Sequence, residues 1–250
     1  MVKVEMINNN GYYSIDYKAL ENACKEPNNT LMIICNPHNP TGRVFNKEEL
    51  SKIGEICNKY NVLMVCDEVH SDLIRKNVKF YPMMNVIGSK NLIVTTAVNK
   101  TFNLAGLQMT NVIIKDEKLK EKFKKEHYSP TPFGIASVIA AYNESEDWVD
   151  ELNEYLDNTI DEIIDYIHTN LPKVKVYKPE GTYILWLDFR GYNLSCEELR
   201  DKIYNKAHVV AQGGTNYDEK DCEQFQRLCV ANPKAQIIEA LERLKKEFNQ

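Results

Sequence analysis

Residues 31–42 read LMIICNPHNPTG, an apolar run followed by a loop that contains two Asn-Pro steps. The run Leu31–Cys35 has the length and the β-branched content of a buried strand. Because a residue that precedes proline is disfavoured in the helical conformation, the chain is expected to leave this strand as a rigid loop. Asn46 then precedes residues 47–60, whose apolar side chains recur at helical spacing and whose first turn holds two glutamates, so a capped helix is predicted there.

The same order of strand and connecting segment continues along the first half of the chain. Val62–Cys66, Leu92–Val98 and Gln108–Ile114 are further apolar runs of strand length. Runs of this kind, separated by helices, indicate a mostly parallel sheet that is covered on both faces. The predicted fold class is therefore α/β.

Polar side chains follow three of these strands. Asn39 lies in the loop after the first strand, residues 67–70 (DEVH) follow the second, and Lys100 follows the third. In open sheets of parallel strands, ligands bind outside the carboxyl ends of the strands. We therefore expect these loops to gather at one edge of the sheet and to form a binding site there.

The second half of the chain has a different pattern. Residues 146–170 place apolar side chains three or four positions apart, which predicts one long helix. Four strands are predicted after it, at residues 174–177, 183–189, 208–211 and 225–230. Two helices are predicted as well, one that Ser195 caps and that ends at about residue 205, and a final one at residues 234–248. This order is typical of a smaller α+β domain. We predict a partial large domain over residues 1–143 and a small C-terminal domain with its linking helix over residues 144–250.

Composition argues against several classes of protein. The 250 residues carry a formal net charge of -5, whereas nucleic-acid-binding proteins have an excess of basic side chains. The longest apolar runs are too short to cross a membrane, and the first residues, MVKVEMINNNGYYSIDY, contain no apolar signal-peptide core. Seven cysteines without a C-x-x-C pair indicate free thiols in a reducing cytoplasm. We expect a cytoplasmic protein with no metal site, no nucleic-acid partner and no membrane contact.

Lys100 and Asp67 are the first candidates for chemistry. A lysine just past a buried strand can be partly desolvated, which lowers the pKa of its amine and makes it a nucleophile toward an aldehyde. A carboxylate at the end of an apolar strand needs a cationic partner, and the protonated pyridine nitrogen of pyridoxal phosphate (PLP) would serve. The alternatives are a solvated lysine and an ordinary ion pair or helix cap.

Asn39, His70 and Arg227 are the other candidates. The loop around Asn39 can hold its amide against a ligand oxygen, although a purely structural turn is the alternative. His70 comes three positions after Asp67, so both can face one pocket, and a packed or solvated histidine is the alternative. Arg227 lies in a predicted strand and can clamp a carboxylate with two hydrogen bonds, unless it faces solvent.

Five segments together resemble one family. NPHNPTGRVF, KEELSKIGEICNKYNVLMVCDEVHSDL, NKTFNLAGLQ, KPEGTYILWLDFR and FQRLCVANP occur in this order. They are similar to segments of the fold-type-I PLP enzymes of the class I/II aminotransferase superfamily, and DEVHSDL and KTFNLAGLQ favour its cystathionine β-lyase-like group. The resemblance implies the PLP-transferase fold of type I, with PLP as the cofactor.

The resemblance also implies a role for each candidate residue. Lys100 matches the Schiff-base lysine, which also moves the substrate Cα proton, and Asp67 matches the partner of the pyridine nitrogen. Asn39 matches the amide that binds the phenolate oxygen of PLP, and His70 stands where many relatives have a tyrosine that touches the same oxygen. Arg227 matches the clamp for the substrate α-carboxylate.

Two features depart from the family pattern. Asn99 precedes Lys100 where many relatives have a serine that helps to bind the cofactor phosphate. The long N-terminal portion of the family, including its phosphate-binding loop, has no counterpart here. We therefore expect exposed sheet edges and apolar faces. As a partner we expect a second copy, forming a homodimer, or a complement that supplies the missing N-terminal segment.

The reaction implied by the resemblance is that of a C–S β-lyase. It is an α,β-elimination from an L-cysteine conjugate such as cystathionine, an amino-acid substrate, to pyruvate, ammonia and a thiol. A PLP-dependent aminotransferase is one alternative, and a non-catalytic remnant or one half of a split enzyme is another. A nucleotide-binding doubly wound domain fits the strand order, but the chain has no G-x-G-x-x-G or Walker A motif.

Overall fold

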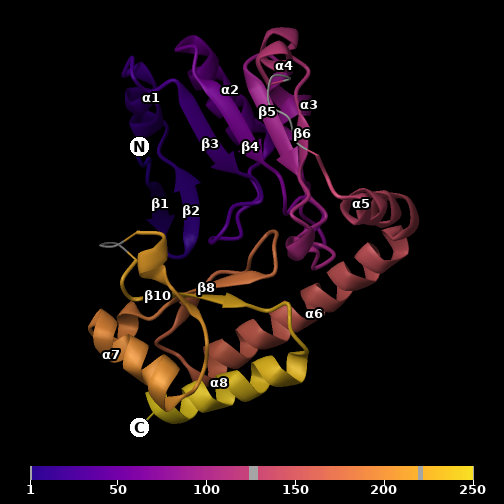
Figure 1. Ribbon diagram of the computed structural model, residues 1–250. Coiled ribbons are helices and arrows are strands. Elements are labelled where there is room, and N and C mark those ends of the chain that lie inside the picture. The colour runs from indigo at the N-terminus through magenta and orange to yellow at the C-terminus, as the bar shows by residue number, and fades with distance from the viewer. Residues whose placement is uncertain (1, 124–128, 219–221, 250) are drawn as a thin grey trace.

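The computed structural model describes residues 2–123, 129–218 and 222–249. Figure 1 shows two separate groups of strands, one above the other, with the long helix α6 (Glu146–Asn170) along one side of the lower group. A short hairpin of β1 (Met6–Asn9) and β2 (Tyr12–Ile15) lies beside them. Asn10 and Gly11 at its turn both have a positive φ, which is the conformation that two-residue hairpin loops require.

The upper group is a four-stranded sheet in the order β3-β4-β5-β6. Its strands β3 (Leu31–Cys35), β4 (Leu63–Asp67) and β5 (Leu92–Thr96) are parallel, and β6 (Asn111–Ile113) is an antiparallel edge. The prediction of a mostly parallel sheet in an α/β fold is confirmed. The three parallel strands lie within one or two residues of their predicted positions.

Three helices cover one face of this sheet. They are α1 (Tyr17–Lys25), α2 (Lys47–Lys59) and α3 (Met83–Ile87). The predicted cap of α2 is present, because Asn46 and Glu49 each accept a hydrogen bond from the other's backbone N–H. The helices and the sheet share one core, formed by Leu20, Cys24, Leu50, Ile53, Cys57 and Met83 against Ile34, Met64, Cys66, Leu92 and Val94.

The opposite face of the sheet is open, and the prediction that both faces are covered is wrong for this chain. Ile33 on that face is 67% exposed, and Leu31 and Val112 are exposed as well. The reason is the strand order. Because β3, β4 and β5 follow one another in a single direction, right-handed crossovers place all of the connecting helices on the same face.

The lower group is an antiparallel sheet in the order β7-β8-β10-β9. Its central strands are β8 (Ile184–Asp188) and β10 (Phe225–Cys229), flanked by β7 (Lys175–Val176) and β9 (Gln212–Gly213). The helices α6, α7 (Cys196–Arg200) and α8 (Lys234–Phe248) share a second core with this sheet. The predicted long helix and final helix are both present at their predicted positions.

Two helices that follow β6 in the sequence were not predicted. They are α4 (Glu117–Phe123) and α5 (Pro132–Glu144). The predicted domain boundary at residues 143–144 falls in the last turn of α5 and stays a prediction. Among the described helices none is long and apolar enough to span a bilayer. No disulfide joins cysteines in the part of the chain that the structure describes.

Arg43 joins the two groups of strands. Its side chain is only 3% exposed and forms ion pairs with Glu49 of α2, at 2.6 Å, and with Glu180, which lies in the turn before β8. Its Nε also donates to the carbonyl of Tyr13 in β2 at 2.8 Å. One buried guanidinium therefore connects the β1–β2 hairpin, helix α2 and the turn before β8.

The backbone beside Arg43 makes a second connection. The N–H groups of Glu180 and Gly181 both donate to the carbonyl of Gly42, at 2.8 and 3.0 Å. Gly42 has a φ of +70°, and a Cβ on it would lie 2.4 Å from the Cβ of Pro179. A side chain is thus excluded twice, by the backbone conformation and by the close approach of the turn.

We predict that Arg43→Leu lowers the free energy of unfolding by about 3–5 kcal/mol, because it leaves the carboxylates of Glu49 and Glu180 without their buried cation. Arg243→Leu is the matched control, since Arg243 is exposed, where it pairs with Glu239 and donates to the carbonyl of His208, and it should cost less than about 1 kcal/mol. Urea denaturation of the two variants measures both values. Equal losses would contradict a special role for Arg43.

Candidate active site

The loops that follow β3, β4 and β5 meet at one edge of the upper sheet. Cys35, Asp67 and Thr95 lie side by side in the ladder, and the N–H of Asn36 donates to the carbonyl of Asp67 at 2.9 Å. Lys100 follows in the turn after β5. The turn of the lower group that holds Glu180 and Gly181 also lies at this edge, because both residues donate to the carbonyl of Gly42 in the loop that follows β3.

Asn39 and Arg227 are brought together from opposite ends of the chain. Arg227 is half-buried in β10, and its Nε donates to Oδ1 of Asn39 at 3.1 Å. Its Nη1 donates to Oε1 of Gln212 in β9 at 2.9 Å. These two bonds hold the guanidinium beside the loop at the sheet edge, and they leave the NH₂ group of the Asn39 amide as a donor for a ligand.

His70 lies between the two groups of strands. Its side chain is 4% exposed, its ring packs edge-to-face on Tyr183 with a centroid distance of 5.6 Å, and its Nδ1 has no hydrogen-bond partner. Burial, together with the smaller effect of the cations of Lys100 and Arg227, lowers the pKa of His70 to about 4. The imidazole of His70 is therefore neutral at pH 7, and the positive charges of Lys100 and Arg227 help to keep it so.

Asp67 is half-buried at the end of β4. Its Oδ1 accepts a hydrogen bond from the N–H of Val69 at 3.1 Å, which fixes the carboxylate at the turn. Side chains alternate between the faces of a strand, so Asp67 shares the open face of the sheet with Val65. The carboxylate is thus accessible to a ligand at the carboxyl end of that face.

Lys100 departs from its prediction. The sequence indicated a partly desolvated amine, but Lys100 is exposed because it lies beyond the strand, in a turn. The turn itself is anchored, since Thr101 Oγ1 donates to Asp72 at 2.8 Å and Phe102 stacks on Trp148 at 5.2 Å. Next to Lys100, the Oδ1 of Asn99 is buried without a hydrogen-bond partner.

Three residues of the site were not predicted. Asn36 is fully buried, and while its Oδ1 accepts from the N–H of Phe45 at 2.9 Å, its Nδ2 has no partner. The first Asn-Pro step was the signal that could have identified it. Gln212 accepts a hydrogen bond from Arg227, and Tyr183 packs on the ring of His70. Nothing in the local sequence of Gln212 or Tyr183 indicates these contacts.

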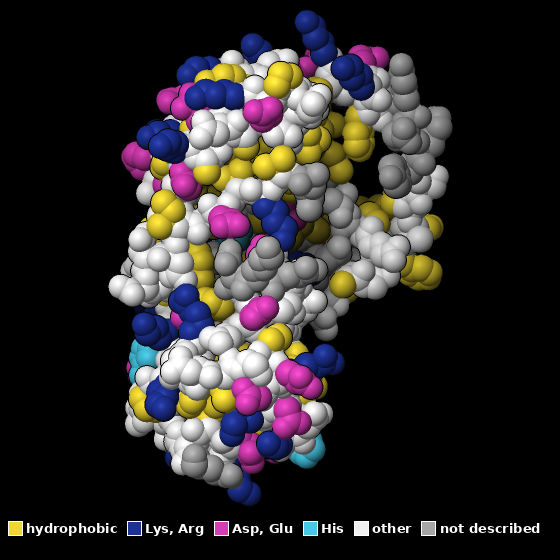
Figure 2. All heavy atoms as spheres, turned by 90° about the vertical axis from the view of Figure 1, so that its left-hand side faces the viewer, with side chains coloured by type: hydrophobic (Ala, Val, Ile, Leu, Met, Phe, Trp, Pro, Cys, Tyr) yellow, Lys and Arg dark blue, Asp and Glu magenta, His cyan; other side chains and the backbone are white. Residues whose placement is uncertain are grey.

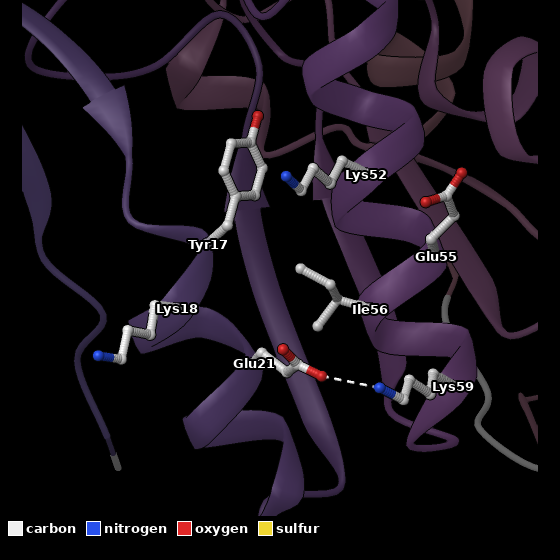
Figure 3. Close-up of a pocket in the computed structure, with 7 residues that line it drawn as sticks. All are labelled: Tyr17, Lys18, Glu21, Lys52, Glu55, Ile56 and Lys59. Carbon is white, nitrogen blue, oxygen red and sulfur yellow. Dashed lines mark hydrogen bonds and ion pairs between the residues drawn. The ribbon is translucent and has the colours of Figure 1, made fainter.

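A groove on the outer surface is separate from this site. It lies between α1 and α2 (Figure 3) and is lined by Tyr17, Lys18, Glu21, Lys52, Glu55, Ile56 and Lys59. Three of its charged side chains already have partners, because Lys59 pairs with Glu21 at 2.8 Å and Lys52 lies 4.5 Å from the centre of the Tyr17 ring. The groove therefore has the character of a solvated helix surface rather than a ligand site.

The groups at the sheet edge form a set with a definite chemistry. It contains an accessible primary amine, a carboxylate held at a strand end, an amide, a neutral imidazole and an oriented guanidinium. An amine can condense with an aldehyde, a carboxylate can hold a cationic ring nitrogen, and a guanidinium can bind a substrate carboxylate.

Known proteins share both the sequence and the fold. The chain is 37% identical over 247 residues to the cystathionine beta-lyase PatB of Bacillus subtilis, which is 96% of this chain and 64% of that protein. It is 29% identical over 252 residues to the aspartate aminotransferase of Pyrococcus horikoshii, which is 98% of this chain and 63% of that protein. Cystalysin from Treponema denticola, whose crystal structure contains a pyridoxal 5'-phosphate cofactor, superposes with a TM-score of 0.95 at 32% identity, covering 99% of this chain and 64% of that one.

The chain thus spans somewhat less than two thirds of the length of these relatives. The family model described as aminotransferase class I and II matches residues 2–244, which is nearly the entire chain. The sheet, the residues at the sheet edge and all of the second core except Phe248 lie inside the matched range. The chain therefore belongs to the aminotransferase class I and II family.

Proposed function

We propose that this chain is the lysine-bearing part of a PLP-dependent C–S β-lyase, which acts on L-cysteine conjugates such as cystathionine. The observation that carries the proposal is the hydrogen bond from Arg227 to Asn39. It fixes a guanidinium beside the loop that follows β3, and the charges of both Arg227 and Lys100 act on His70, so the carboxylate clamp and the amine belong to one site. The relatives named as a cystathionine beta-lyase and as cystalysin support the same assignment.

The residues present fit PLP. Lys100 offers an exposed amine for the aldehyde, and Asp67 offers a carboxylate for the ring nitrogen. The buried Nδ1 of His70 has no protein partner, which is typical of an atom that meets a ligand. The amide of Asn99 has an unpartnered oxygen as placed, and with the amide turned its NH₂ would serve as a donor for the phosphate.

Each residue then has a task. When bound, PLP supplies an electron sink that stabilises negative charge at the substrate Cα. Lys100 would hold the cofactor through its Nζ and, with the substrate bound, would take the Cα proton at the same atom. Asp67 would keep the proton on the ring nitrogen. As the thiolate leaves Cβ, Lys100 would pass the proton to it, and its Nζ would then take back the cofactor and release the enamine, which water hydrolyses to pyruvate and ammonia.

Arg227, Asn39 and His70 orient the reacting groups. Arg227 binds the substrate carboxylate with the part of its guanidinium that Asn39 and Gln212 leave open. The Asn39 NH₂ would donate to the phenolate oxygen of bound PLP. His70 stays neutral, so it can share a hydrogen bond with that oxygen without placing a third positive charge beside Lys100 and Arg227.

Transamination is the second candidate, because it uses the same groups and the same removal of the Cα proton. The similarity to an aspartate aminotransferase favours it. The two reactions differ in the fate of the proton on Lys100, which would go to the cofactor in transamination and to the departing thiolate in elimination. We further propose a cytoplasmic location, supported by cysteines without disulfide spacing, and an assembly as a homodimer or with a complementary polypeptide.

The first test is covalent. Added PLP followed by borohydride is expected to leave a stable adduct on Lys100, detected by peptide mass spectrometry. Lys100→Ala should abolish this adduct, whereas Lys90→Ala, which removes another exposed lysine near a strand end, should not. An adduct spread over surface lysines would refute the assignment of Lys100.

The second test is catalytic. With PLP and L-cystathionine the assembled enzyme is expected to release pyruvate, and a 2-oxo acid that retains the sulfur would indicate transamination instead. Arg227→Lys removes a two-pronged clamp worth about 1.5–3 kcal/mol, so KM should rise about 10- to 150-fold with a smaller change in kcat. An unchanged KM would show that the carboxylate binds elsewhere.

The third test concerns pH. The unfolded chain protonates His70 near its ordinary pKa of 6.5, whereas the folded chain does so only near 4. Since unfolding takes up a proton between these values, the free energy of unfolding should fall as the pH drops from about 6.5 to 4. His70→Asn should reduce the loss between pH 7 and pH 5 by about 1–2 kcal/mol, and His168→Asn, on the exposed side of α6, should follow the parent. A His70→Asn variant with the parent's pH dependence would contradict the neutral buried ring.

A further inference from the structure

The turn that carries Lys100 is closed by two backbone hydrogen bonds. The N–H of Phe102 donates to the carbonyl of Val98 at 2.9 Å, and the N–H of Leu104 donates to the carbonyl of Asn99 at 3.1 Å. Lys100 lies within both of these hydrogen-bonded segments, so its backbone has little freedom while the turn is closed. The position of the turn in the fold therefore determines the region that the Lys100 amine can reach.

Thr101, the residue after Lys100, fixes that position. Its side chain is only 3% exposed, and its hydroxyl donates to Oδ2 of Asp72 at 2.8 Å. A hydrogen bond to a carboxylate is about twice as strong as one between neutral groups. The side chain of threonine is also branched at Cβ, which restricts its rotamers. The bond is therefore a firm connection between the turn and Asp72.

Asp72 is itself held by the long helix α6. Its carbonyl accepts a hydrogen bond from the side-chain amide of Asn153 in α6 at 2.8 Å, and Oδ1 of Asn153 accepts one from Arg75 at 3.2 Å. Arg75 is almost fully buried and pairs with Asp157, also in α6, at 3.1 Å. The backbone of Asp72 is thus bound to the helix, while its carboxylate is bound to Thr101.

The loop that contains Asp72 also contains two residues of the candidate active site. Asp67 and His70 precede Asp72 after β4. The bond from Thr101 to Asp72 therefore joins two loops at the sheet edge, one with Asp67 and the other with Lys100. In Figure 2 the surface is hollowed between the upper and the lower group of strands, and acidic and basic side chains gather around the hollow.

We propose that Asp72 is a positioning residue for Lys100, and that it acts through the hydroxyl of Thr101. The aldehyde and the ring nitrogen of PLP lie at opposite ends of a rigid ring, so the two groups that hold these ends must keep one separation. The bond between Thr101 and Asp72 maintains this separation between Lys100 and Asp67. This role toward PLP rests on the proposed function, whereas the holding of the turn rests on the hydrogen bond alone.

The first measurement is amide exchange in the chain without PLP, followed at Phe102 and Leu104. Thr101→Val keeps the branched shape of the side chain but removes the hydroxyl, and Asp72→Ala removes the acceptor. Each is expected to speed the exchange of both amides about tenfold or more, because the turn opens more often once a charged hydrogen bond is lost. Thr101→Ser retains the hydroxyl and should exchange like the parent. Thr159→Val, at an equally buried threonine of α6, is the matched control and should also exchange like the parent.

The second measurement is the rate at which PLP and borohydride label Lys100, relative to Lys90 in the same protein. Thr101→Val and Asp72→Ala should each lower this ratio about tenfold or more, because a misplaced amine reacts more slowly. Thr101→Ser should keep the parent's ratio. Because both substitutions break one bond, the variant that combines them should lose no more than either alone. Urea denaturation verifies that all variants are folded.

Three outcomes would overturn the proposal. They are unchanged exchange in Thr101→Val, an equal loss in Thr101→Ser, and losses that multiply in the combined variant. A parent chain that forms no adduct at Lys100 would refute the proposed function, and with it the role of Asp72 toward PLP. Amide exchange needs no PLP, so it would then still decide whether Asp72 holds the turn.

Discussion

The buried ion cluster around Arg43 is the interaction on which the rest of the structure depends. Two carboxylates from different parts of the fold, Glu49 and Glu180, converge on one guanidinium that is almost entirely removed from solvent. In such a place an unpaired charge is costly, so each partner requires the others to be in position. The loop that carries Asn39 lies between β3 and Arg43, and it is therefore held between the two sheets.

The same connection explains how the site is built. Lys100, Asp67 and Asn39 come from the upper sheet, whereas Arg227 comes from the lower one, and each sheet has its own core. The bond between Arg227 and Asn39 is formed only when both units are docked. His70, which follows β4 of the upper sheet, is buried against Tyr183 of the lower group and therefore lies at the contact between the two sheets. The proposed chemistry is thus a property of the contact between the units rather than of either sheet.

The one-sided sheet is the second constraint. Strands added in one direction with right-handed crossovers place every connecting helix on a single face, so a chain with the order β3-β4-β5 cannot cover its own sheet twice. The consequence is an apolar face that ends at Asp67, with helix α5, which has no charge before Glu144, at its border.

The sequence by itself determined the elements and their order. Apolar runs of strand length, the Asn46 cap and the helical spacing of residues 146–170 depend on near neighbours, so β3, β4, β5, α2 and α6 could be predicted, as could the edge where Asp67 and Lys100 lie. Only the tertiary structure decided which face of the sheet is covered, how exposed Lys100 is, and that Arg227 reaches Asn39 across 188 positions of the chain. Helix α5 was missed because an evenly apolar segment has no periodic pattern to identify it. Burial and long-range pairing depend on how layers pack, and no local stretch of sequence contains that information.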